Sequence, residues 1–374
     1  MNALQLSRLL GLWLTPLAGQ QERLINALRR VQADDWHQFV GVASHCLLTP
    51  ALYHMAQRKQ LLAYLPVELS DYLHAIHQLN SQRNARLRAQ SLRVIDTLNA
   101  AGIRPLALKG IASLLTDLYP DEGMRVLGDI DLLVMREELP RALACLRASG
   151  YCYATENLLD SYAGHHHAPP LLHSAELGAV ELHHDLAPAY ASKRLLDVAF
   201  CWQRALPLAL ASRQCYVLHP NARLLHNFHH SHWLDYHFLT GTLSLRQNLE
   251  WLYLCQRYQG DIDTAWCLAT AQKQGLLTAL GSYQRSCQYY YGQPLFNDLP
   301  VSRRAALHSY RERCRQQHLL LTRLNQLCSA TVLAGHYVGQ FSAQAIGRRY
   351  PEQSLWQGRL LWWQKLGKRF PPVM

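Results

Sequence analysis

The feature that constrains the fold most is the segment Gly128–Val134, in which two aspartates flank one isoleucine and run into apolar residues. Alternation along a β-strand would place Asp129 and Asp131 on one face and Ile130 on the other. Two parallel carboxylates repel each other unless a cation lies between them. The segment therefore predicts a strand that carries two metal-binding aspartates, and the alternative is a pair of acids at a solvated strand end.

A strand followed by a helix is expected upstream of the two aspartates. Residues 103–108 favour a short buried strand, and apolar residues then recur at helical spacing up to Tyr119. Lys109 and Gly110 stand at the junction, where the N–H groups of the first helical turn attract anions and a glycine lets a ligand approach the backbone. This order of elements suits a nucleoside triphosphate at the helix start, with Mg²⁺ bridging its phosphates to the aspartates.

A third carboxylate is expected, because two acids rarely complete the oxygen shell of such a metal site. Glu181 and His183 would share one face of an apolar strand, so Glu181 can reach the same metal if this strand pairs with that of Asp129. The alternative for Glu181 is a solvated strand residue. Arg125 and Gly128 lead from a basic turn into the acidic strand, and the alternative for Arg125 is a surface arginine.

Together these residues resemble the bacterial family of uncharacterised nucleotidyltransferases in the DNA polymerase β-like superfamily. The resemblance is carried by Lys109–Gly110, Arg125, Gly128–Val134, His167 and Glu181–His183. It covers the centre of the chain well and extends more loosely into the C-terminal helices. Two positions depart from the usual patterns: His184 replaces a common aromatic residue, and Lys109–Gly110 replaces the Gly-Ser step of the superfamily, as in related toxin nucleotidyltransferases.

The resemblance implies a role for each residue in transferring a nucleoside monophosphate from an NTP such as ATP. Asp129, Asp131 and Glu181 would bind Mg²⁺ or, alternatively, Mn²⁺, and Glu181 would also help to activate the acceptor hydroxyl. Lys109 and the backbone of Gly110 would hold the β- and γ-phosphates. The other nucleotide-binding residues that the resemblance implies are Arg125, Gly128, His167 and His183.

The acceptor of the nucleotidyl group is open. We expect a pyrophosphate-releasing enzyme that modifies a hydroxyl or phosphate of a small molecule, a peptide or a protein. The alternatives are a toxin-type enzyme acting on the 3′ end of tRNA, and a catalytically inactive nucleotide-binding or scaffold module. The net charge of +11 makes RNA a candidate partner. Because the basic residues are dispersed, as on solvated helix faces, RNA is not favoured.

The predicted fold class is α+β, with a small mixed nucleotidyltransferase sheet flanked by helical regions. We divide the chain into an N-terminal helical region at 1–100, an α/β core at 101–206 and a C-terminal helical region at 207–374. Pro50 and Pro66 are expected to split the first region into short helices. Ten scattered cysteines without a Cys-x-x-Cys pair, and no apolar run of transmembrane length, indicate a cytoplasmic protein with reduced thiols.

Two further patterns are expected to be structural. Asp261 and Asp263 repeat the acid-x-acid pattern, but the residues that follow favour a helix start with an aspartate N-cap, and no Lys-Gly step precedes them. Arg246 and Glu250 have the spacing of a salt bridge within a helix.

The histidine-rich segments resemble metal sites only in composition. The run His165–His167 does not match the ligand spacing of the usual zinc sites. His226 and His230 share one helix face, which favours a helix that packs its histidines beside the active site.

Overall fold

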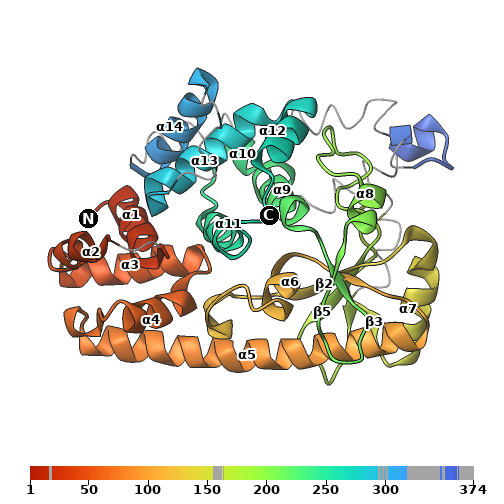
Figure 1. Cartoon of the computed structure of the whole chain (residues 1–374), viewed down its shortest axis with the longest axis horizontal. Coiled ribbons are helices and arrows are strands. Elements are labelled where there is room, and N and C mark those ends of the chain that lie inside the picture. Colours follow the sequence, from red (N-terminus) through yellow and green to blue (C-terminus); the bar gives the residue numbers. More distant parts are fainter. Residues whose placement is uncertain are drawn as a thin grey trace, which may run out of the picture.

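In the computed structural model of the chain, the predicted acidic strand lies at the centre of a mixed β-sheet that is surrounded by helices (Figure 1). The fold class is therefore α+β, as predicted. The structure describes residues 1–16, 19–154, 162, 164–293, 296, 299, 302–317, 346, 347, 350–359 and 361.

Within these residues the sheet has seven strands in the order β3-β4-β5-β2-β1-β7-β6. The strands are β1 Leu106–Ala107, β2 Asp129–Leu133, β3 Cys152–Tyr153, β4 Leu171–Leu172, β5 Ala179–His183, β6 Leu206–Pro207 and β7 Tyr216–Val217. Strand β2 pairs antiparallel with β1 and parallel with β5, and Asp131 lies opposite Glu181. The predicted adjacency of the two acidic strands is confirmed. The sheet also continues beyond residue 206, because β7 pairs with β1.

Five α-helices precede the sheet in the described part of the chain. They are α1 Ala3–Leu14, α2 Gln21–Leu28, α3 Ala33–His45, α4 Thr49–Arg58 and α5 Val67–Ala100, with a short 3₁₀ turn, η1 Leu62–Tyr64, before α5. Pro50 lies in the first turn of α4, but the prediction of short helices is wrong for α5, which has 34 residues. Pro66 caps its start, where a proline is tolerated, and no glycine or proline interrupts the helix afterwards.

The remaining helices lie between the strands or after them. They are α6 Lys109–Leu115, α7 Leu139–Ala148, α8 Val198–Gln203, α9 Pro220–Phe228, α10 His237–Thr240, α11 Leu245–Arg257, α12 Thr264–Lys273, α13 Leu277–Tyr291 and α14 Arg303–Gln317, with short helical turns η2 Glu122–Met124, η3 Arg136–Glu138 and η5 His229–Leu234. Helix α6 begins at Lys109 as predicted, but it ends at Leu115 rather than near Tyr119. Asp117 has a φ of 45°, and the Leu118 N–H donates back to the Ser113 carbonyl. This left-handed cap terminates the helix one turn early.

Two hydrophobic cores hold these layers together. One lies where α5, α6 and α7 cover the sheet, and it contains Leu87, Ile130 and Leu146. The other joins the N-terminal helices to the C-terminal ones, and it contains Trp13 of α1 and Trp251 of α11. Helix α5 runs beneath both the sheet and the N-terminal helices and contributes to both cores (Figure 1). The division at residues 100 and 206 stays a prediction.

The cysteine thiols and the lengths of the helices complete the description of the fold. The nine cysteines in the described part of the chain are free. Among the described helices, none is both long enough and apolar enough to cross a bilayer.

Candidate active site

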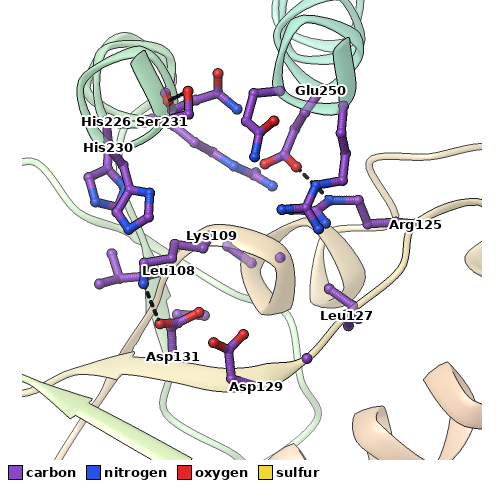
Figure 2. Close-up of a pocket in the computed structure, with 18 of the residues that line it drawn as sticks. Leu108, Lys109, Arg125, Leu127, Asp129, Asp131, His226, His230, Ser231 and Glu250 are labelled. Carbon is purple, nitrogen blue, oxygen red and sulfur yellow. Dashed lines mark hydrogen bonds and ion pairs between the residues drawn. The ribbon is translucent and has the colours of Figure 1, made fainter. Parts of the chain in front are cut away.

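Three carboxylates converge on one face of the two central strands. Asp129 and Asp131 extend from β2 into a pocket (Figure 2), while Ile130 between them is buried on the other face. The parallel register places Glu181 of β5 beside Asp131. Donor atoms of Asp131, Glu181 and His183 lie within 4.8 Å of one another. Of the three acids predicted as metal ligands, Asp131 and Glu181 thus lie within metal-ligand distance of each other, and Asp129 lies beside Asp131 in the pocket.

The three carboxyl groups differ in their affinity for protons. Burial, followed by the charge of Asp131, raises the pKa of Asp129 to about 6. Burial alone would raise the pKa of Asp131 too, but Lys109 and His183 outweigh it and hold that pKa far below its ordinary value. At Glu181 burial is likewise opposed, by His183 and His167, and its pKa is lowered. All three groups are therefore ionised at neutral pH, which suits a divalent cation.

Lys109 contacts this acidic cluster from an unusual backbone conformation. Its φ of 47° lies in the left-handed region, which residues with a side chain rarely adopt. Its Nζ lies 2.8 Å from Oδ1 of Asp131. Strain of this kind is concentrated at functional sites, where the surrounding structure maintains it. The side chain predicted to hold phosphates is thus paired with a carboxylate in this structure, at the edge of the pocket.

The two glycines of the motif have different structural roles. A Cβ on Gly110 would lie 2.2 Å from Cδ2 of Leu127, because the Leu127 side chain covers the first turn of α6. Gly110 itself lines the pocket, so the missing side chain allows this packing, and the predicted contact of its backbone with a ligand stays a prediction. A Cβ on Gly128 would meet no described atom within 4 Å, so the backbone here borders open space.

Arg125 is anchored rather than surface-exposed. Its Nε donates to Oε2 of Glu250 at 2.8 Å, and its Nη1 donates to the Val126 carbonyl at 2.7 Å. Glu250 also accepts a hydrogen bond from Ser113 of α6 at 3.1 Å. The predicted pair of Arg246 with Glu250 is corrected, because α11 turns Glu250 toward Arg125. The buried pair connects the turn before β2 to the C-terminal helices.

Two arginines that the sequence analysis did not assign line the same pocket. Arg223 of α9 donates to Ser113 Oγ at 3.1 Å and to Tyr258 Oη at 3.3 Å. Arg246 of α11 lies with its Nη1 3.5 Å from the Val126 carbonyl. Burial and the neighbouring charge of Arg125 lower the pKa of Arg246 to about 10. Such crowding of buried cations is typical of sites that bind anions.

The pocket has a volume of about 170 Å³, and its walls carry opposite charges. Asp129 and Asp131 lie on the strand side, and His226 and His230 on the helices opposite (Figure 2). The prediction that these two histidines pack beside the acidic site is confirmed. Burial, followed by the charge of Lys109, lowers the pKa of His226 to about 3, so its ring is neutral.

His183 and His167 approach the acids in different ways. His183 is 1% exposed, and its Nε2 lies 2.9 Å from Oδ1 of Asp131 and 3.7 Å from Oε2 of Glu181. This position fits a residue that orients Asp131 better than the nucleotide-binding role that the resemblance implies for His183. The His167 ring lies 5.0 Å from that of His183 and lines a second cavity instead of the acidic pocket.

The run of adjacent histidines converges, contrary to expectation. Ring nitrogens of His165, His166 and His167 lie within 4.8 Å of one another. In a regular strand successive side chains would point to opposite faces. Here the chain bends at His166, which brings the three rings together. Local spacing did not reveal this, because the convergence depends on an irregular backbone.

Comparisons with known proteins identify the family of the chain. Among curated proteins no match was found, and among solved structures none was found either. A family model described as "Uncharacterised nucleotidyltransferase" matches residues 32–292, which include every strand and helix that lines the pocket. This supports a general nucleotidyl-transfer function. The chain therefore belongs to the family of uncharacterised nucleotidyltransferases.

Proposed function

We propose that the protein is a Mg²⁺-dependent enzyme that transfers a nucleoside monophosphate from an NTP to a hydroxyl or phosphate of a small molecule, peptide or protein. The observation that carries the proposal is the pocket in which Asp129 and Asp131 lie opposite the buried Arg223 and the half-buried Arg246. Carboxylates bind hard divalent cations, and guanidinium groups bind phosphates. One pocket therefore contains carboxylates for the cation and guanidinium groups for the phosphates of a nucleotide with bound Mg²⁺.

The donor set fits a hard cation. Asp129, Asp131 and Glu181 supply carboxylate oxygens from two paired strands. Bound Mg²⁺, or Mn²⁺ in its place, would neutralise charge on the triphosphate and on the departing pyrophosphate. Lys109 and His183 both contact Oδ1 of Asp131, so we assign the metal to its Oδ2.

The cations of the pocket hold the triphosphate in this proposal. Arg125 is fixed by Glu250, and its Nη2 lies toward the first turn of α6, 3.6 Å from where a Cβ of Gly110 would be. A guanidinium that is already held in place loses little conformational freedom when a phosphate binds. Arg246 remains charged at neutral pH with a pKa of about 10 and binds the phosphates from the side of α11.

Lys109 connects the metal ligands with the phosphates. It lines the pocket and contacts Asp131, so its ammonium group has a carboxylate on one side and the nucleotide space on the other. We assign it to the β- and γ-phosphates, where it binds as a point charge.

Glu181 is the proposed proton acceptor for the attacking hydroxyl. It is ionised at neutral pH, because its pKa is below the ordinary value, and it lies beside Asp131 on the neighbouring strand. His183 contacts both acids and orients them. Position within reach of the proton matters first for a general base, and basicity second.

The proposal is tested by incubating the protein with Mg²⁺, cell extract and each α-labelled NTP in turn. We expect label on a metabolite, peptide or protein with the wild-type chain and none with Asp129→Asn/Asp131→Asn. The matched control, Asp261→Asn/Asp263→Asn, removes the same number of carboxylates outside the pocket and should transfer label normally. Label on RNA would select the RNA-modifying alternative. Without any NTP consumption or Mg²⁺-dependent nucleotide binding, the proposal fails and the inactive scaffold replaces it.

A further inference from the structure

A second cavity adjoins the proposed nucleotide pocket. It has a volume of about 460 Å³, and Lys109, His230 and Asp235 line both cavities. Its outer wall is formed by the three histidines of the segment His165–His167 together with aromatic side chains, namely Tyr190, Trp233 and Tyr236. Three adjacent histidines thus border this cavity, whereas Asp129 and Asp131 border only the nucleotide pocket.

The three histidines have the spacing of metal ligands. Their donor nitrogens lie within 4.8 Å of one another. Nitrogens bound to one tetrahedral Zn²⁺, at about 2.0–2.1 Å each, are roughly 3.3 Å apart. The observed limit is somewhat longer than this separation, so the three rings would move closer together on binding one ion.

The hydrogen bonds of the rings leave nitrogens for a metal. His167 Nδ1 lies 2.8 Å from the Ala168 carbonyl and donates to it, so its Nε2 carries the free lone pair. A backbone acceptor on the other ring nitrogen is the usual support of a metal-binding histidine. His166 Nδ1 is buried without a hydrogen-bond partner among the described residues. An orphaned buried nitrogen is unfavourable unless something binds it.

His165 contacts another residue that lines the same cavity. Its Nε2 contacts the Tyr190 hydroxyl at a distance of 3.5 Å, which is the long limit for a hydrogen bond. The His165 ring therefore borders the second cavity beside Tyr190.

We propose that His165, His166 and His167 bind one Zn²⁺ ion, with an open coordination position facing the second cavity. Imidazole nitrogens select borderline transition metals, whereas the carboxylates of the neighbouring pocket select Mg²⁺ or Mn²⁺. Three protein ligands with one open position are typical of zinc that also binds a substrate or water. The ion would coordinate an oxygen or nitrogen donor of a molecule in the cavity. This site adjoins the proposed nucleotide pocket, because Lys109 lines both cavities.

The test measures metal binding by the full chain in the presence of excess Mg²⁺, which occupies the carboxylates. We expect one Zn²⁺ per chain by elemental mass spectrometry, and the visible absorption of tetrahedral Co²⁺ after substitution. His165→Asn/His166→Asn should weaken Zn²⁺ binding by about 100-fold or more, because two ligands are lost. The matched control is His37→Asn/His45→Asn, two exposed histidines of α3, and it should bind as the wild type does.

Two further variants keep the proposal open to contradiction. Asp129→Asn/Asp131→Asn should retain the zinc, so loss of catalysis and loss of this site are separable. His166→Cys should add a thiolate-to-Co²⁺ charge-transfer band, which appears only if residue 166 is a ligand. Less than one Zn²⁺ on the wild type, equal affinity of the double histidine variant, or no new band from folded His166→Cys would overturn the assignment.

Discussion

The chain contains the acid-x-acid pattern twice, and the two copies have opposite uses. Asp263 caps α12 by accepting a hydrogen bond from the Trp266 N–H at 2.8 Å, and both it and Asp261 are exposed. Asp129 and Asp131 lie instead on the central strand, where Asp131 is 1% exposed. The prediction that the second copy is structural is confirmed. At a helix start the backbone needs an acceptor, whereas in a paired strand it does not, so the strand carboxylates remain for another ligand.

The two acid-x-acid copies also differ in how their aspartates affect the stability of the folded chain. A cap such as Asp263 stabilises its helix. Asp129 has the opposite effect, because burial and the charge of Asp131 raise its pKa to about 6 and make its ionisation unfavourable in the folded chain. An inactive scaffold gains nothing from retaining such a group, and a catalytic site does.

The largest expected difference between the two copies is in catalysis. Asp131→Asn should lower nucleotidyl transfer by about 1,000-fold or more, because a metal ligand contributes several kcal/mol to transition-state stabilisation. Asp263→Asn should stay within about twofold of the wild type, because an asparagine N-cap replaces the aspartate. Rates of label transfer to the acceptor measure both. Equal losses in the two variants would remove the distinction.

A smaller effect on catalysis is expected from replacing His183, which orients the carboxylate of Asp131. His183→Leu removes the contact of 2.9 Å with Asp131 and should lower kcat by about 10- to 100-fold, with little change in KM for the NTP. His183→Gln keeps a donor near the same place and should restore much of the rate. The comparison of kcat with KM separates positioning from phosphate binding. Full activity of His183→Leu would contradict the positioning role.

The pH dependence of metal binding should also distinguish the two copies. Asp129 must lose its proton to bind a cation, and its pKa is about 6. Mn²⁺ affinity should therefore rise about tenfold between pH 5 and pH 7, as the protonated fraction falls. Titrations followed by the electron paramagnetic resonance of free Mn²⁺ measure this rise. Asp261→Asn/Asp263→Asn should show the same pH profile, and a flat profile in the wild type would contradict the raised pKa.

Sequence patterns predicted the features that depend on neighbouring residues. Strand alternation gave the shared face of Asp129 and Asp131, and the Lys-Gly step gave the start of α6. The pairing that brings Glu181 beside Asp131 was inferred from the chemistry of the metal site. The first two signals extend over a few residues, so the sequence alone reveals them.

The features that were missed depend on contacts between distant parts of the chain. Glu250 pairs with Arg125, which is 125 residues away, because α11 packs over α6. Arg223 and Arg246 enter the pocket on helices whose own spacing gives no sign of it. The Leu127 side chain lies where a Cβ of residue 110 would be, and neither residue alone predicts this contact. Helical spacing assigns a residue to a face, but only the packed fold shows what that face contacts.

The smallest predicted effect is on the free energy of unfolding, which should rise for Asp129→Asn and fall for Asp263→Ala. The folded pKa of Asp129, about 6, lies above its ordinary value of 3.8, so the stability associated with its protonated form is present below pH 3.8 and is lost as the pH rises through 6. In metal-free protein at pH 8, Asp129→Asn should therefore raise the free energy of unfolding by about 1–2 kcal/mol after allowance for solvent screening. Asp263→Ala should lower it by about 1 kcal/mol, because a cap is lost. Denaturant unfolding with a chelator at pH 8 and pH 5 measures both, and the gain from Asp129→Asn should shrink at pH 5. Destabilisation by both variants at pH 8 would show that the strand carboxylate is structural, like the helix cap.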